Sequence, residues 1–240
     1  MKNTGAIVIP ARFKSARFPG KPLVKINGKM MIEHVYERCV SAVGESVVYV
    51  ATDDVMISDA VKNFGGKVVM TSPDCLTGTD RLAEANLQLN CDFLVNVQGD
   101  EPMINPISVR SVFDAMMLEP SQLLNCYCII NDNEISMSTV PKVVVSESGR
   151  LIYMSRGGCP FDKNGTARAL FKQVCIYGFS RYHLEIFRNH PQKTINENLE
   201  DIEILRFLDL DQKVMMLKVA SGSVAVDTPE DLERVRSLMD

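Results

Sequence analysis

Short β-rich runs alternate with stretches of helical periodicity along this chain of 240 residues. The apolar runs predict strands at 5–9, 46–51, 67–71, 93–98, 123–130, 141–146, 151–154, 174–179 and 214–219. The amphipathic stretches predict helices at 29–43, 55–64, 79–90, 107–118, 181–189, 199–210 and 229–239. Such alternation is typical of βαβ units, so we expect an α/β fold with a mostly parallel, twisted sheet flanked by helices.

The alternation loosens after about residue 120, where predicted strands follow one another through short polar connections such as 131–133. This change indicates a small antiparallel sub-lobe, roughly 123–180, attached to the α/β body. Neither a linker nor an internal repeat divides the sequence, so we expect one domain that spans 1–240.

Charge and composition argue against several classes of protein. A net charge of −4 does not suit a general nucleic-acid binder, so we expect no nucleic-acid partner. No apolar stretch approaches the roughly 18 residues that span a bilayer, and we expect no membrane association. The N-terminus shows no secretory signal pattern, and the seven cysteines, an odd number, fit reduced thiols. Together these features predict a cytoplasmic protein.

A basic loop follows the first predicted strand. It carries Arg12, Lys14, Arg17 and Lys21 among glycine and proline residues. One interpretation is a solvated surface loop. The other is a cradle for a triphosphate, because ligands of open α/β sheets bind at the carboxyl ends of the strands.

Two aspartates are candidate ligands for a divalent cation. Asp100 follows the predicted strand 93–98, and Asp227 follows an apolar run, 223–226, that reads as another short strand. Mg²⁺ prefers one or two protein carboxylates together with phosphate oxygens. The alternative for Asp100 is a helix-capping role. Thr228 is the expected N-cap of the last helix, which leaves Asp227 unexplained by capping.

A third segment, 77–81, precedes a predicted helix. Thr79 or Asp80 could cap that helix, and its free N–H groups and the small Gly78 could also hold a base or ribose edge. The run 52–54 ends a strand and is interpreted as a plain helix cap.

Six motifs from one end of the chain to the other together resemble the CMP-Kdo synthetases, the 3-deoxy-manno-octulosonate cytidylyltransferases. The motifs are Pro10-Ala11-Arg12, 17–23 (RFPGKPL), 50–54 (VATDD), 77–81 (TGTDR), 96–102 (NVQGDEP) and 226–232 (VDTPEDL). The resemblance implies a nucleotide-diphospho-sugar transferase-like fold. It also implies that CTP is joined to the anomeric hydroxyl of an acidic 2-keto-3-deoxy sugar, Kdo or a close variant. The products would be pyrophosphate and a CMP-sugar for lipopolysaccharide or capsule.

The resemblance also assigns roles to residues. It implies catalytic roles for Arg12, Lys21, Asp100 and Asp227, with Mg²⁺ held by the two aspartates. The implied nucleotide contacts are Pro10, Ala11, Arg12, Arg17, Lys21, Thr77, Gly78, Arg81 and Gln98, and Lys14 is a less secure phosphate contact. The implied sugar contacts are Arg156, Gln173, Tyr177, Glu203 and Asp227. The family commonly forms homodimers through the sub-lobe, so a homodimer is expected here.

The sugar motifs depart from the family pattern. The family shows Ser-Arg-Ser-x-Ile-Pro, His-x-Gly-Ile-Tyr and Leu-Glu-Gln-Leu-Arg, where this chain reads 155–160 (SRGGCP), 173–177 (QVCIY) and 202–206 (IEILR). Gln173 thus stands at the His position and Ile204 at a Gln position. Because polar groups that bond sugar hydroxyls discriminate strongly, a changed acid sugar is one hypothesis. Examples are 8-amino-Kdo and a nonulosonic acid.

Three other interpretations stay open. The chain could use Kdo through a drifted pocket. It could be a CTP-binding relative without catalysis, although retention of both Asp100 and Asp227 speaks against that. It could also serve another base or a non-acidic acceptor, against which Arg156 argues by offering a cation for a sugar carboxylate.

Overall fold

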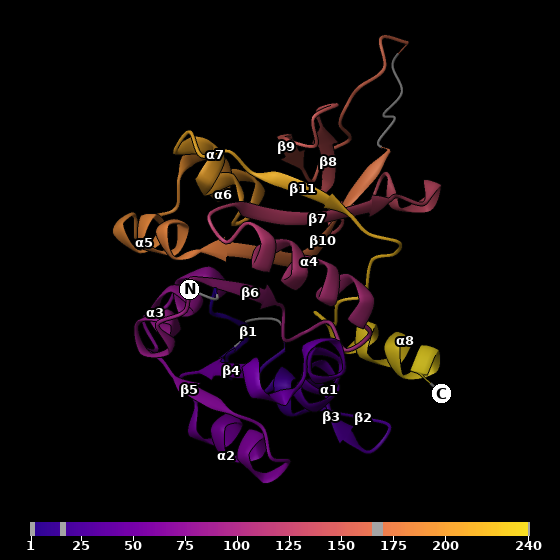
Figure 1. Cartoon of the computed structure of the whole chain (residues 1–240). Helices are drawn as coiled ribbons and strands as arrows, with labels where there is room; N and C mark the ends of the chain where they lie inside the picture. The colour runs from indigo at the N-terminus through magenta and orange to yellow at the C-terminus, as the bar shows by residue number, and fades with distance from the viewer. Residues whose placement is uncertain (1–2, 15–17, 165–169, 240) are drawn as a thin grey trace.

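A computed structural model describes residues 3–14, 18–164 and 170–239 (Figure 1). Its strands are β1 (Gly5–Ala11), β2 (Lys25–Ile26), β3 (Lys29–Met30), β4 (Val48–Thr52), β5 (Val68–Met70), β6 (Phe93–Val97), β7 (Leu123–Ile129), β8 (Lys142–Val145), β9 (Leu151–Ser155), β10 (Phe171–Ser180) and β11 (Met215–Lys218). Its helices are α1 (Met31–Val43), α2 (Val55–Asn63), α3 (Gly78–Leu89), α4 (Pro106–Leu118), α5 (Arg181–Asn189), α6 (Ile195–Glu200), α7 (Leu205–Asp209) and α8 (Pro229–Met239). Short 3₁₀ turns are η1 (Lys21–Leu23), η2 (Glu45–Val47) and η3 (Asp132–Glu134).

One mixed sheet forms the centre of the molecule, with the strand order β11-β7-β10-β6-β1-β4-β5. Strands β6, β1, β4 and β5 pair in parallel. Strand β10 runs antiparallel between β6 and β7, and β8 and β9 extend the antiparallel part. The expected α/β fold with an antiparallel addition is confirmed. The added strands continue the main sheet.

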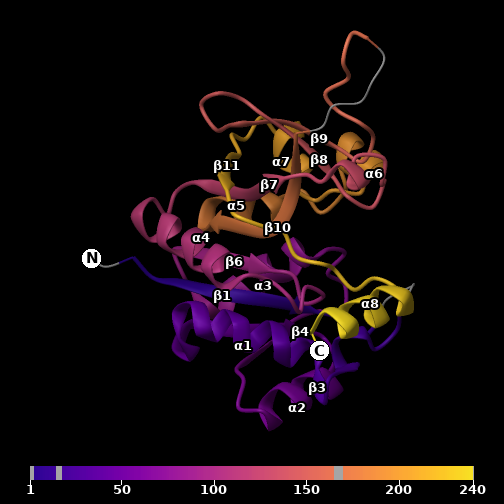
Figure 2. The ribbon, with the colours of Figure 1, turned by 90° about the vertical axis from the view of Figure 1, so that its right-hand side faces the viewer.

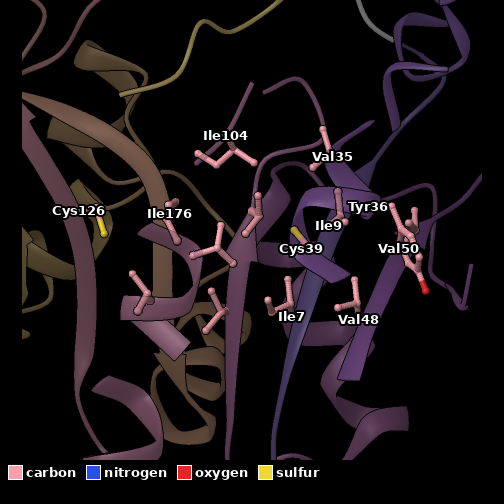
Figure 3. Close-up of a cluster of buried hydrophobic side chains, with 14 of the residues drawn as sticks. Ile7, Ile9, Val35, Tyr36, Cys39, Val48, Val50, Ile104, Cys126 and Ile176 are labelled. Carbon is pink, nitrogen blue, oxygen red and sulfur yellow. The ribbon is translucent and has the colours of Figure 1, made fainter. Parts of the chain in front are cut away.

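Side chains of the central strands alternate between two hydrophobic layers. On β1, Ile7 and Ile9 face the layer that contains residues of α1, α2 and α4 (Figure 3). Ala6 and Val8 face the layer that contains residues of α3, α5 and α7. Because β1 is covered on both faces, its sequence is apolar without interruption, as is usual for central parallel strands. Burial of each isoleucine side chain contributes about 1.5–3 kcal/mol to the free energy of folding.

The last helix returns to the start of the chain. Figure 2 shows α8 beside the β2–β3 hairpin, and Leu232 and Val235 pack there with Ile26 and Met31. This packing brings the segment before α8, which includes Asp227, back to the parallel half of the sheet.

The structure corrects two predicted elements. Residues 199–210 form the two short helices α6 and α7, because Asp201 adopts a left-handed conformation (φ 50°) that ends α6. The run 223–226 forms no strand. It makes one backbone hydrogen bond instead, from Val226 N to the carbonyl oxygen of Asp100 at 2.9 Å.

Cys39, Cys126 and Cys128 are buried free thiols, and Cys91 is a partly buried one. Within the described ranges, no helix has the length and apolar character of a membrane span.

Candidate active site

The loop after β1 delivers Lys21 to the carboxyl end of the parallel strands. Gly20 closes the loop by donating its backbone N–H to the carbonyl oxygen of Phe13 at 2.9 Å. Its φ of 72° lies in the left-handed region that glycine adopts without strain. Lys21 follows at the start of η1, and its side chain is 12% exposed.

The Lys21 ammonium contacts both predicted metal ligands. Its Nζ lies 2.7 Å from Asp100 Oδ2 and 3.2 Å from Asp227 Oδ1. The structure therefore brings together three of the four predicted catalytic side chains, from positions far apart in the sequence. The fourth, Arg12, is exposed and lies one residue beyond β1.

Local hydrogen bonds hold Asp227 in place. Thr228 and Asp231 form the expected capping pair, with Asp231 N donating to Thr228 Oγ1 at 3.2 Å and Thr228 N to Asp231 Oδ2 at 2.9 Å. The backbone N–H of Asp227 also donates to Asp231 Oδ2, at 3.1 Å. Capping thus uses the Asp231 carboxylate, and the Asp227 carboxylate is turned toward Lys21.

A cavity of about 640 Å³ opens at this end of the sheet. It runs from the loop after β1 to the antiparallel strands. The predicted site residues that line it are Pro10, Ala11, Arg12, Lys21, Thr77, Gly78, Arg81, Gln98, Asp100, Arg156, Gln173, Tyr177, Glu203 and Asp227. Lys14 is exposed and is not among the lining residues, and Arg17 lies outside the described residues.

Gly78 lies in a tight corner of the cavity, at the end lined by the predicted nucleotide contacts, which we call the nucleotide end. A Cβ atom there would lie 3.3 Å from Pro10 Cγ and 3.5 Å from Gln98 Nε2. The predicted cap of α3 is wrong by position, since the N-cap is Thr77 and not Thr79 or Asp80; Asp80 completes the capping box as its N3 residue. The same segment both caps α3 and lines the cavity.

Two predicted contacts of this cavity also have partners within the protein. Arg81 is 3% exposed, and its guanidinium lies 3.1 Å from Asp53 Oδ1. Glu203 accepts from Thr79 N at 3.0 Å and from Thr79 Oγ1 at 2.6 Å, at the start of α3. Asp54, as expected, caps α2.

Arg156 forms part of the opposite end of the cavity, which also includes Gln173 and Tyr177 and which we call the sugar end. Its guanidinium donates to three backbone carbonyl oxygens, those of Ser138 (3.1 Å), Asp201 (3.0 Å) and Glu200. These bonds join β9 to the turn before β8 and to the end of α6. They use three of its five N–H groups, and no bond from the other two to a described residue is present.

A bulge in β10 brings Gln173 and Tyr177 together. The pairing register of β10 shifts between Val174 and Tyr177, and the buried Asn125 Nδ2 donates to the carbonyl oxygens of Val174 (3.1 Å) and Ile176 (2.9 Å). Asn125 Oδ1 must then accept, and it does so from Gln173 Nε2 at 3.0 Å. Gln173 Nε2 also donates to the Tyr177 hydroxyl at 3.1 Å. The amide oxygen of Gln173 is thereby left as an acceptor.

Comparisons with known proteins show the family to which the chain belongs. The cytidylyltransferase family model matches residues 6–218. The chain belongs to the cytidylyltransferase family. It is therefore a nucleotidyltransferase, as the resemblance had implied.

Relatives within the cytidylyltransferase family narrow the group. A protein described as 8-amino-3,8-dideoxy-manno-octulosonate cytidylyltransferase, from Shewanella oneidensis, is 41% identical over 234 residues, 95% of each chain. Its counterpart from Shewanella amazonensis is 40% identical over the same length. A solved CMP:2-keto-3-deoxy-manno-octonic acid synthetase in complex with CTP has a TM-score of 0.91 and 39% identity, with 98% of each chain covered. The chain thus belongs with the CMP-Kdo synthetases.

A more distant likeness shows the fold alone. A glucose-1-phosphate thymidylyltransferase from Bacillus anthracis has a TM-score of 0.72 at 13% identity, over 98% of this chain and 94% of that one.

The cytidylyltransferase cavity also contains a residue that the sequence reasoning missed. Glu101 is 6% exposed and lines the cavity directly beside Asp100. Burial, and then the charge of Asp100, raises its pKa to about 7. Cys175 and Ser223 adjoin it. Its position next to Asp100 in the sequence could have flagged it, but burial could not be read from the motif.

The two aspartates fit a divalent cation of the kind that also binds phosphate. Within the described part of the chain, no group of three or more His, Cys, Asp or Glu side chains is arranged to hold a metal ion by itself. Asp100 and Asp227 supply two carboxylates around one position, now shared with the Lys21 ammonium. Such a pair suits Mg²⁺ only when other oxygens, such as those of a triphosphate, complete its coordination.

Proposed function

We propose that this protein joins CTP to the anomeric hydroxyl of an acidic 2-keto-3-deoxy octulosonate, with release of pyrophosphate. The observation that carries the proposal is the meeting of Lys21 with Asp100 and Asp227 in a cavity that is lined by almost all the predicted site residues. The anomeric oxygen would form a bond to the α-phosphorus. The bond from that phosphorus to the β-phosphate would break, and the hydroxyl proton would be lost to solvent.

The residues of the nucleotide end neutralise and orient the phosphates in this proposal. Lys21 and Arg12 supply positive charge, and the corner formed by Gly78, Pro10 and Gln98 receives the cytidine. Catalysis then depends on orientation and on electrostatic stabilisation of the charge that develops at phosphorus.

Asp100 and Asp227 would hold Mg²⁺ in the reacting complex. The ion supplies Lewis-acid stabilisation of phosphate oxygens. To admit it, the Lys21 ammonium must move from between the two carboxylates toward the triphosphate.

The acceptor that we propose is the 8-amino sugar. Relatives at 40–41% identity are described as acting on it, and the CMP-Kdo synthetase structure stands at 39%. Identity alone therefore does not separate the two sugars, and the geometry at Gln173 supplies the argument. Its amide oxygen can accept a hydrogen bond but cannot donate one, which suits an ammonium group.

Initial rates of pyrophosphate release with CTP and either 8-amino-Kdo or Kdo test the proposal. We expect kcat/KM to favour the amino sugar by about tenfold or more, the effect of one charge-assisted hydrogen bond. Gln173→His should reduce that ratio by about tenfold, while Gln88→His, on the exposed part of α3, should leave it unchanged. Equal or better turnover with Kdo would exclude the amino preference. No pyrophosphate release with any acid sugar would exclude the proposed reaction and favour a CTP-binding relative without catalysis.

We also propose that the enzyme acts in the cytoplasm, where CTP is made, as a homodimer formed through the antiparallel part. Ile129, Ile152 and Leu170 expose apolar surface there, at 64%, 53% and 63%. Light scattering tests the dimer, with an expected mass of twice the 26.7 kDa of the chain.

A further inference from the structure

Lys142 is a fully buried lysine behind the sugar end of the cavity. It is the first residue of β8, and its exposed fraction is 0%. Its Nζ donates to the carbonyl oxygens of Met137 at 2.6 Å and of Arg156 at 2.7 Å. One ammonium thus joins the turn before β8 to Arg156, whose side chain lines this end of the cavity.

Lys142 has no carboxylate partner among the residues that the structure describes, in contrast to its neighbour in the sheet. Lys172, which pairs with Lys142 across β10 and β8, forms an ion pair with Glu134. A buried ammonium without a directly bonded counter-ion is costly, and burial lowers the pKa of Lys142 although the charge of Glu200 acts to raise it. A group retained at such a cost calls for a role that a neutral side chain would not fill.

Arg156, which lines the cavity, is likewise bonded to backbone carbonyl oxygens. Its guanidinium is bonded to the carbonyl oxygens of Ser138, Glu200 and Asp201, and no ion pair links it to a described carboxylate. Lys142 and Arg156 therefore both bond to the 137–138 turn, Lys142 at the carbonyl oxygen of Met137 and Arg156 at that of Ser138. Both bring positive charge to this wall. The Glu200 carboxylate lies beside them, where it accepts from the backbone N–H of Arg156 and from Ser155 Oγ, both at 2.7 Å.

We propose that Lys142 is a positioning residue for Arg156, and that the two cations together select an acceptor sugar that carries a carboxylate. This inference rests on the proposed function, because it assigns the sugar end of the same cavity. Lys142 fixes the backbone from which the Arg156 side chain extends, and the two N–H groups that Arg156 retains are the donors for the carboxylate. The Lys142 charge adds to the attraction through the low-dielectric wall.

A purely structural anchor is the competing explanation, and the two make different predictions. An anchor would affect stability and all substrates alike. A positioning residue for a carboxylate site would affect the acid sugar alone, and would weaken the discrimination between an acid and its neutral amide.

Lys142→Met is the direct test, with Lys172→Met as the matched control of a neighbouring lysine that has a carboxylate partner. We expect Lys142→Met to raise KM for the acid sugar about 10- to 100-fold and to leave KM for CTP within about twofold. Lys172→Met should leave both KM values within about twofold, whatever its effect on stability.

The second readout compares two competitive inhibitors, the 2-deoxy acid sugar and its 1-carboxamide. The wild-type enzyme should bind the acid at least about 100-fold more tightly than the amide, and Lys142→Met should lower that ratio at least about tenfold. Lys142→Arg, which keeps the charge, should retain most of the ratio.

Each outcome decides one claim. A wild-type enzyme that releases no pyrophosphate with any acid sugar refutes the proposed function itself. An active wild type whose acid-to-amide ratio is near one refutes the carboxylate site, even if the Lys142 variants fail to fold. An unchanged ratio in folded Lys142→Met refutes the role of Lys142 alone.

Discussion

The two ends of the cavity hold their cations in different ways. At the nucleotide end, Lys21 lies against two carboxylates, at 2.7 and 3.2 Å. At the sugar end, Arg156 and Lys142 are bonded to backbone carbonyl oxygens. The first arrangement is internally neutralised and must rearrange when phosphates and a metal ion bind. In the second, neither cation forms an ion pair with a described carboxylate, although the Glu200 carboxylate accepts from the backbone N–H of Arg156. This end is already assembled.

Because of this difference, the two ends offer different charges to a ligand before substrate binds. Carbonyl oxygens carry partial charge, so they orient a guanidinium without cancelling its attraction for an anion. A carboxylate orients a cation too, but its full negative charge also cancels the attraction of that cation for an anion. We therefore expect the sugar end to bind a carboxylate without rearrangement, and the nucleotide end to depend on several ligands that bind together.

The largest expected effect comes from Asp100→Asn and Asp227→Asn, which remove one charge from the nucleotide end. Each should lower turnover by roughly 10³-fold or more, because the metal–phosphate charge loses a carboxylate. Both side chains are partly exposed, at 28% and 37%, so the melting temperature should change little. Pyrophosphate release and thermal melting measure the two quantities. If either variant kept near-wild-type activity in Mg²⁺, the metal assignment would be wrong.

Arg206→Met should lower the free energy of unfolding, because it removes a buried ion pair from the half of the molecule that contains the sugar end. Arg206 is 0% exposed and donates to both oxygens of Glu197, at 2.6 and 2.7 Å, which ties α7 to α6. Loss of one partner of a buried pair costs about 3–5 kcal/mol in free energy of unfolding. Urea denaturation measures this loss. Arg236→Met, in an exposed pair with Glu233, is the control and should cost no more than about 1 kcal/mol.

Equal losses in the two variants would show that the buried pair adds nothing to this half of the molecule. The comparison between the ends would then rest on ligand binding alone.

His183, which packs on the sugar half, gives the smallest effect, a dependence of stability on pH. It is 7% exposed, and burial lowers its pKa to about 4. Because the folded pKa lies below the unfolded value of about 6.5, its contribution is complete above about pH 6.5 and is lost as the pH falls toward 4. The free energy of unfolding should drop by about 2 kcal/mol between pH 7 and pH 5 from this group.

Replacement of the imidazole isolates that contribution. His183→Leu should remove about 2 kcal/mol of the drop between pH 7 and pH 5, measured by urea denaturation at each pH. The control is His190→Asn at an exposed position, which should follow the wild-type pH profile. A wild-type profile in His183→Leu would assign the acid sensitivity to other groups.

The nucleotide end could be predicted largely from the sequence. Its cations and carboxylates follow strands whose order and direction are set by apolar patterning, so Lys21 and Asp100 were expected at one edge of the sheet. Asp227 was expected there for a partly wrong reason, since 223–226 is no strand; the bond from Val226 N to the Asp100 carbonyl oxygen and the bond from Asp227 N to Asp231 hold it there.

The sugar end could be predicted only in outline. The partners of Arg156 and Lys142 are backbone carbonyl oxygens, which every residue has and no side-chain pattern reveals. The left-handed Asp201 that divides α6 from α7 and the bulge that joins Gln173 to Tyr177 depend on tertiary packing. Gln173, at the His position of the family pattern, was the local signal of a change in this segment.

Phosphorus-31 NMR of the wild-type enzyme with CTP, Mg²⁺ and 8-amino-Kdo follows the proposed reaction itself. We expect a new phosphodiester signal, from the CMP-sugar, that grows together with pyrophosphate in equal amounts. We expect neither signal above background when Asp100→Asn replaces the wild type. Pyrophosphate that appears with free CMP, or no change in the CTP signals with either 8-amino-Kdo or Kdo, would contradict the proposed reaction.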